Sequence, residues 1–179
     1  KLLNLGCANR IFSNWVNADF FTIKPWSRIN KNKIGINWEL DLRYPLNCED
    51  NYWDGIFMEH VLEHLKAKNA INLLKELYRT LKPGSHIRIS VPDLQKYIDF
   101  YLGRNPYIFD LPYKALVIYR LVYNAGHRSC YDYEIIKEML KQTGFKKINR
   151  SVFGKSIDNR LIMDSIERKN VTLYVEAQK

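Results

Sequence analysis

The chain has 179 residues, a length that predicts one domain, 1–179, with a single hydrophobic core. Hydrophobic residues make up 46% and charged residues 26%, as in ordinary globular proteins, and no apolar run approaches the roughly 20 residues of a membrane-spanning helix. The net charge of +9 suits an anionic partner, but Lys and Arg are scattered along the chain, which favours a solvated basic surface over a nucleic-acid site.

Short apolar segments in the first sixty residues are predicted to be strands, and each ends in a small or polar residue. "KLLNLG" ends at Gly6, "WVNAD" ends at Asp19, and "INWELD" ends at Asp41. "YWDGIFMEH" is a further apolar run, which ends at Glu59 and His60. Every one of these strand ends therefore carries a residue suited to contact a ligand.

The second part of the chain alternates between helical and strand patterns. "NAINLLKELYRTLKPG" has helical spacing and a Pro-Gly stop, and "SHIRISVPDL" alternates as a strand does. A second amphipathic helix is predicted over Tyr131–Thr143, with Asp132 as its N-cap and Gly144 just past its end. "FKKINRSVF" and "NVTLYVEAQ" are predicted strands. The pattern predicts an α/β fold with helices on both faces of a mostly parallel sheet and an antiparallel hairpin at one edge.

In such a sheet, ligands bind at the carboxyl ends of the strands, so the residues at the predicted strand ends should gather along one edge. Gly6 and Ala8 are small enough for a backbone to pass close to a ligand, although the dinucleotide fingerprint G-x-G-x-x-G is absent. Asp19 and Asp41 can accept hydrogen bonds from ribose hydroxyls or an exocyclic amine. Taken singly, either acid also fits a helix cap or a turn.

The segment His60-Val-Leu-Glu63-His64 has the H-x-x-E-H spacing of a class of zinc peptidases. Glu134 or Glu138 could supply a third ligand. The chain is short for that fold, however, and the motif follows a strand end within a parallel-sheet pattern. We therefore predict that the spacing is incidental and that there is no metal site.

An aromatic-rich insertion follows the predicted strand "SHIRISVPDL" and extends over about residues 95–128. Its aromatic residues are Tyr97, Phe100, Tyr101, Tyr107, Phe109, Tyr113, Tyr119 and Tyr123. Long segments at this place are usually substrate walls or lids, and aromatic faces suit a sugar or another ring. The alternatives are that about half of these residues form the core of a helical cap, or that "PYKALVIYRLVY" lies on a membrane surface, for which its charges are few.

Segments spread over nearly the whole chain resemble, in order, the class I S-adenosylmethionine-dependent methyltransferases. They are "LLNLGCAN", "VNADF", "WELDLRYPL", "WDGIFMEHVLEHL", "LLKELYRTLKPGSHIRISVPD" and "GHRSCYDYEIIKEMLKQTGF". The resemblance is greatest to small bacterial-type methyltransferases linked with surface-polysaccharide biosynthesis. It implies a three-layer Rossmann-like methyltransferase fold and S-adenosylmethionine as cofactor.

The resemblance also implies which residues bind the cofactor: Gly6, Cys7, Ala8, Asp19, Phe20, Asp41, Leu42, Met58 and Glu59. The glycine loop would line the methionine portion, Asp19 would hold the ribose, Asp41 with Leu42 would lie at the adenine, and Met58 with Glu59 would lie near the sulfonium. Two departures from the family are visible. Ala8 replaces a common glycine, which is tolerated if its φ stays negative, and the link from Gly6 to "WVNAD" leaves room for a very short first helix or none.

Methyl transfer to oxygen requires the acceptor to lose a proton, and imidazole is a common base for this purpose. His127 matches an active-site histidine of related methyltransferases and is the first candidate, with His60 second. His64 is expected to be an interior histidine bonded to a backbone group, and His86 is expected at the surface.

The leading hypothesis is thus a cytoplasmic S-adenosylmethionine-dependent O-methyltransferase with a small-molecule or carbohydrate acceptor. The odd, well-separated cysteines fit a reduced compartment. The alternatives are an RNA or DNA methyltransferase, a zinc peptidase, and a non-catalytic cofactor-binding domain. Against the first, no N-P-P-Y tetrapeptide follows the fourth strand; against the last, Asp19, Asp41 and Glu59 are all retained.

Overall fold

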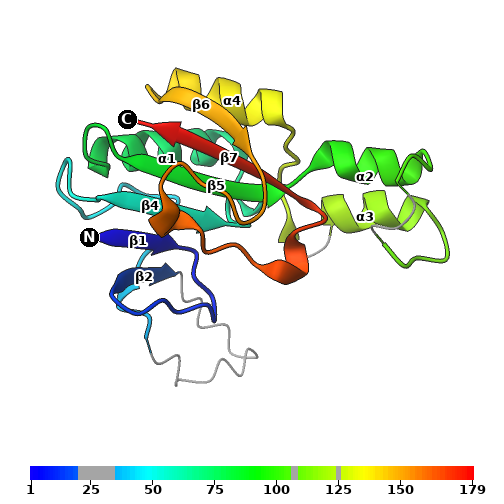
Figure 1. The fold of residues 1–179 in the computed structure, drawn as a ribbon, viewed down its shortest axis with the longest axis horizontal. Coiled ribbons are helices and arrows are strands. Elements are labelled where there is room, and N and C mark those ends of the chain that lie inside the picture. Colours follow the sequence, from blue (N-terminus) through cyan, green and yellow to red (C-terminus); the bar gives the residue numbers. More distant parts are fainter. Residues whose placement is uncertain (20–34, 106–108, 124–125) are drawn as a thin grey trace.

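A seven-stranded mixed sheet is the centre of the computed structural model, which describes residues 1–19, 35–105, 109–123 and 126–179 (Figure 1). The strands are β1 (Leu2–Leu5), β2 (Trp15–Asp19), β3 (Trp38–Glu39), β4 (Gly55–Glu59), β5 (His86–Pro92), β6 (Lys146–Ser151) and β7 (Thr172–Gln178). Their order is β3-β2-β1-β4-β5-β7-β6, and only β7 runs antiparallel to its neighbours. The predicted mostly parallel sheet with an antiparallel C-terminal strand is confirmed.

One face of the sheet packs against the helices α1 (Ala67–Thr80) and α4 (Tyr133–Gln142). Apolar residues at alternating strand positions meet the apolar stripes of both helices, and the resulting core cluster contains Leu3, Leu5, Ile56, Met58, Ile87, Ile89, Leu74, Leu77, Ile136 and Leu140. The predicted cap is confirmed, because Asp132 Oδ1 accepts the Ile135 N–H at 2.9 Å. Gly144 follows the end of α4 with φ of 102°.

The opposite face is covered by the connection between β6 and β7, residues 152–171, which forms the third layer. It contains two 3₁₀ turns, Asn159–Leu161 and Ile166–Arg168. Arg88 of β5 holds this connection on the sheet: its guanidinium is 0% exposed and donates to both carboxylate oxygens of Asp164, at 2.8 and 2.6 Å, and to Glu176 at 2.8 Å. It also donates to the backbone oxygens of Val152 and Lys155. This face of the sheet is therefore held by a buried ionic network.

The insertion forms a helical hairpin of α2 (Leu94–Tyr101) and α3 (Ala115–Tyr123), which lies beyond the carboxyl ends of β4 and β5 (Figure 1). Tyr97 and Phe100 are buried there against Val117 and Leu121. Tyr101, Tyr113, Tyr119 and Tyr123 are exposed, and Tyr107 lies outside the described residues. Within the described ranges, no helix combines the length and apolar character needed to span a membrane.

The carboxyl ends of β1 to β4 lead into loops along one edge of the sheet. Residues 6–14 contain turns and no helix, as the short link predicted. After β4 the chain makes a 3₁₀ turn, Leu62–His64, before α1 begins.

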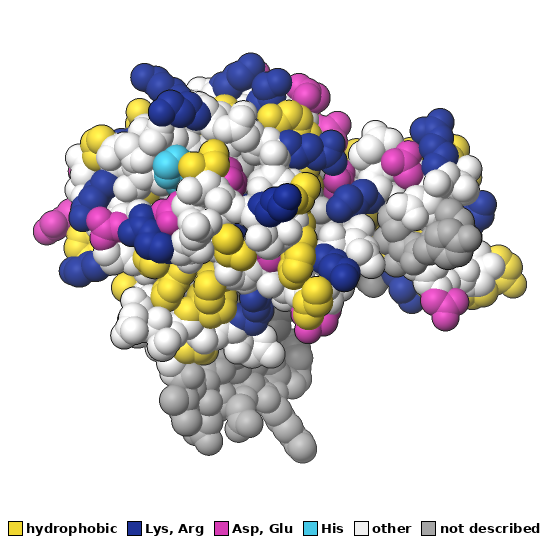
Figure 2. All heavy atoms as spheres, in the orientation of Figure 1, with side chains coloured by type: hydrophobic (Ala, Val, Ile, Leu, Met, Phe, Trp, Pro, Cys, Tyr) yellow, Lys and Arg dark blue, Asp and Glu magenta, His cyan; other side chains and the backbone are white. Residues whose placement is uncertain are grey.

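Over the face shown in Figure 2, Lys and Arg side chains are spread among Asp and Glu, and the basic stretch 24–33 lies outside the described residues.

Candidate active site

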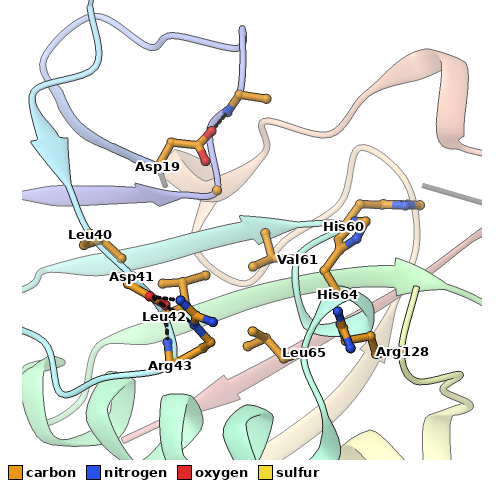
Figure 3. A pocket seen from close by; sticks show the side chains of 12 residues that line it. Asp19, Leu40, Asp41, Leu42, Arg43, His60, Val61, His64, Leu65 and Arg128 are labelled. Atoms are coloured by element: carbon orange, nitrogen blue, oxygen red, sulfur yellow. Dashed lines mark hydrogen bonds and ion pairs between the residues drawn. The ribbon is translucent and has the colours of Figure 1, made fainter. Parts of the chain in front are cut away.

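A cleft of about 440 Å³ opens at this edge of the sheet (Figure 3). Its lining residues are Gly6, Ala8, Asp19, Leu40, Asp41, Leu42, Arg43, His60, Val61, His64, Leu65 and Arg128. The acids lie on one side and the histidines with Arg128 on the other, and Val61 and Leu65 lie between them. The structure thus brings together Gly6, Ala8, Asp19, Asp41, Leu42 and His60 from the predicted set.

The turn after β1 is close-packed and fixed to the neighbouring strand. Gly6 and Cys7 both donate their backbone N–H to Ala18 O, at 2.8 and 3.1 Å. Gly6 has φ of 70°, and a Cβ at this position would lie 2.3 Å from Val61 Cγ2. No other residue fits here without displacing Val61 from the cleft wall.

Ala8 has φ of 46°, so the condition under which alanine replaces glycine here without strain, a negative φ, is not met. In this left-handed turn, which glycine adopts freely, the Ala8 N–H donates a hydrogen bond to Asp19 Oδ2.

Replacing Ala8 by glycine is therefore expected to raise the free energy of unfolding by about 0.5–1 kcal/mol, because glycine removes the cost of a positive φ. Chemical denaturation measures the change. Ala70→Gly, inside α1, is the control and is expected to lower the same quantity by about 1 kcal/mol or more. A less stable Ala8→Gly protein would contradict the strain assigned to this turn.

Asp19 is the last residue of β2, and Asp41 follows the neighbouring strand β3. Both residues line the cleft. Arg43 donates to Asp41 through Nε, at 2.9 Å to Oδ1, and through Nη2 and its own backbone N–H. The Arg43 hydrogen bond lowers the pKa of Asp41, so this carboxylate stays ionised to more acidic pH than usual. The sequence analysis did not single out Arg43 as a partner of Asp41.

Several predicted cofactor residues lie outside the cleft lining. Cys7 is buried, Met58 is fully buried in the core, and Phe20 lies outside the described residues. The Glu59 carboxylate accepts the Ser165 N–H of the β6–β7 connection at 2.9 Å and pairs with Arg10 of the loop between β1 and β2. The Glu59 side chain is thus committed to holding that connection.

His60 lines the cleft, and both of its ring nitrogens face protein groups. Nε2 lies 2.8 Å from Thr172 Oγ1, and Nδ1 lies 3.2 Å from Glu63 Oε1. The residue has φ of 55°, an uncommon backbone conformation for a non-glycine residue that is enriched at functional sites. The His60 ring is therefore oriented by Thr172 and Glu63 at the wall of the cleft.

His127 is not among the residues that line the cleft, but it contacts the lining residue His64 and directly precedes the lining residue Arg128. Its Nδ1 lies 2.7 Å from Leu121 O. A carbonyl oxygen only accepts, so Nδ1 carries the proton and Nε2 has the lone pair. The ring centroids of His127 and His64 are 5.0 Å apart in an edge-to-face arrangement. His64 lines the cleft, whereas the sequence analysis predicted an interior histidine.

The mostly parallel sheet and its strand order, with a cleft at the carboxyl ends of the strands, define a Rossmann-like fold. Residues 1–149 match the protein family described as a methyltransferase domain, and the chain belongs to that family. It is accordingly an enzyme whose family uses S-adenosylmethionine as methyl donor. A comparison with curated proteins gave no match.

Solved structures with this fold include S-adenosylmethionine-dependent methyltransferases from Archaeoglobus fulgidus and Mesorhizobium loti. The first is 21% identical with a TM-score of 0.61, and the match covers 99% of this chain and 85% of that chain. The second is 18% identical with a TM-score of 0.61 and coverage of 100% and 90%. A possible histamine N-methyltransferase from Thermotoga maritima is 14% identical, with a TM-score of 0.60 and coverage of 100% and 82%. At these identities the likeness establishes the fold.

Proposed function

We propose that this enzyme methylates an oxygen atom of a small-molecule or carbohydrate acceptor. The observation that carries the proposal is the division of one cleft into an acidic side, with Asp19 and Asp41, and a side with His60, His64 and Arg128. The finer acceptor class, a precursor of surface polysaccharide, rests on the sequence resemblance.

The acidic side of the cleft suits the cofactor. The volume of about 440 Å³ lies within the roughly 300–1,000 Å³ usual for ligand pockets. Gly6 lets the turn after β1 pack directly against Val61 at the cleft wall, Asp19 offers oxygens for ribose hydroxyls, and Asp41 with Leu42 lies where we place the adenine. When bound, S-adenosylmethionine supplies an electrophilic methyl group on a sulfonium.

The histidine side of the cleft is where we place the acceptor. Positioning the acceptor behind the methyl group can supply most of the rate acceleration, and the acceptor oxygen also has a proton to lose. We assign that proton to His127, because its Nδ1 is engaged by Leu121 O and its Nε2 lone pair is left for chemistry. His60, with both nitrogens engaged, is assigned to positioning the neighbouring Glu63.

The α2–α3 hairpin supports this assignment, since Leu121 belongs to α3 and fixes the His127 ring. We propose that residues 95–128 form the acceptor wall of a single domain, 1–179. The exposed Tyr119 and Tyr123, whose rings lie 5.2 Å apart on α3, suit stacking on a sugar ring.

His127→Gln is expected to lower kcat for methyl transfer by about 100-fold or more and to leave the affinity for S-adenosylmethionine unchanged. The assay follows labelled methyl transfer to a panel of nucleotide sugars, oligosaccharides and small alcohols, with generic RNA as a separate arm. His86→Gln, at the start of β5, is the matched control and should keep full activity.

Loss of cofactor binding in His127→Gln would contradict the assignment. Methylation of RNA alone, weakened steeply by salt, would overturn the acceptor class.

A further inference from the structure

Glu63 is a buried carboxylate without a hydrogen-bonded partner. It is 1% exposed, and neither Oε1 nor Oε2 accepts a hydrogen bond from any described residue. His60 Nδ1 lies 3.2 Å from Oε1 but forms no hydrogen bond with it. A buried carboxylate left in this state is costly, and a bound ion is one of the few ways to offset that cost.

Two imidazoles lie beside this carboxylate. One ligand atom from each of Glu63, His64 and His127 lies within 4.8 Å of the others. His127 donates Nδ1–H to Leu121 O, the arrangement by which proteins fix the tautomer and orientation of a histidine that ligates metal through its other nitrogen. One nitrogen of each imidazole thus lies close to the buried carboxylate.

The backbone holds these groups in place. Arg128 and Ser129 donate their N–H groups to Glu63 O, at 2.7 and 3.1 Å, and Ser129 Oγ donates to Leu65 O at 2.9 Å. These bonds fasten the segment that carries His127 to the 3₁₀ turn that carries Glu63 and His64. The ligand atoms of a tetrahedral zinc site lie about 3.3 Å apart. Side-chain rotations that move each ligand atom by about an ångström would therefore bring all three within reach of one cation.

We propose that Glu63, His64 and His127 bind a divalent transition-metal cation at the acceptor side of the cleft. Two imidazoles and a carboxylate suit zinc or iron(II) and disfavour magnesium and calcium, which prefer all-oxygen sites. Three protein ligands leave a position for water or the acceptor oxygen, and His64 lines the cleft. The proposal rests on the proposed function and revises one role in it: with the cation bound, the His127 Nε2 lone pair is a ligand and no longer a base, and the cation would assist loss of the acceptor proton by holding the acceptor oxygen.

This site differs from the peptidase motif that the sequence contains. In H-x-x-E-H peptidases both histidines are ligands, whereas here His60 faces Thr172 Oγ1 and the second histidine is His127, far along the chain. The sequence analysis predicted no metal at this motif and did not consider the combination of Glu63 and His64 with His127.

The test is a titration of the purified protein, first stripped with chelator, with zinc by calorimetry and with cobalt(II) by visible absorption. We expect one cation per chain and cobalt bands typical of a low-symmetry, nitrogen- and oxygen-ligated site. His127→Ala and Glu63→Gln should each weaken binding by at least about tenfold, since loss of a ligand costs no less than loss of its supporting partner. His86→Ala, which removes a histidine outside the cluster, should not.

S-adenosylhomocysteine binding by the same samples reports on their folding and tests the proposed function separately. Cofactor binding without stoichiometric metal binding would overturn the metal site and leave the proposed function standing. Metal binding that is lost in His86→Ala, or retained in both cluster variants, would also overturn it. Failure of the wild-type protein to bind the cofactor would overturn the proposed function instead.

Discussion

Arg88→Met is expected to lower the free energy of unfolding by about 3–5 kcal/mol, the usual cost of removing one partner from a buried ion pair. Asp164 and Glu176, 1% and 4% exposed, would lose the cation that neutralises them. The β6–β7 connection would also lose its bonds at Val152 O and Lys155 O. Urea denaturation followed by circular dichroism measures the change.

The control is Arg104→Met, which removes an exposed arginine 3.4 Å from Asp99 and should change stability by no more than about 1 kcal/mol. A second comparison removes the whole network: Arg88→Met combined with Asp164→Leu and Glu176→Met should recover part of the loss, because no buried charge is then unpaired. Equal stability of Arg88→Met and Arg104→Met would show that the network does not hold this face.

Asp41→Ala is expected to weaken S-adenosylmethionine binding by about 10- to 150-fold, the equivalent of losing one hydrogen bond to a charged group, roughly 1.5–3 kcal/mol. The carboxylate lines the acidic side of the cleft, and Arg43 fixes its orientation through Nε and Nη2. Calorimetric titration of the variant measures the loss.

Asp50→Ala is the matched control, since Asp50 pairs with Arg79 and its side chain is 67% exposed away from the cleft lining. Its cofactor affinity should equal that of the wild-type protein. An Asp41→Ala variant that binds as tightly as Asp50→Ala would remove Asp41 from the cofactor site.

Periodicity predicted the sheet well because the strands β1, β4, β5 and β7 are short apolar runs with clear ends. The covering of the second face could not be predicted in this way. Arg88 occupies an alternating strand position that normally faces solvent, and its burial depends on acids that lie 76 and 88 residues away in the chain. The segment "INWELD" contributes only Trp38 and Glu39 to the sheet, since β3 is an edge strand whose pairing with β2 is brief.

In the candidate site, strand ends correctly predicted that Gly6, Asp19, Asp41 and His60 would meet along one edge. The positions of the strand ends did not predict the direction in which each side chain points. Glu59 immediately precedes His60, yet its carboxylate is drawn to Arg10 and the Ser165 N–H on the far side of the strand. The meeting of Glu63 with His127 likewise depends on backbone bonds between the 3₁₀ turn and residues 128–129, which no local pattern encodes.

The central claim, that this cleft binds S-adenosylmethionine through residues of the chain itself, is tested most directly by calorimetric titration of the wild-type protein in the presence of chelator. We expect saturable binding with one cofactor per chain that does not require metal, because the proposed cofactor residues Gly6, Asp19 and Asp41 include none of the proposed metal ligands. Absence of binding, or binding that appears only when zinc is added, would contradict the account.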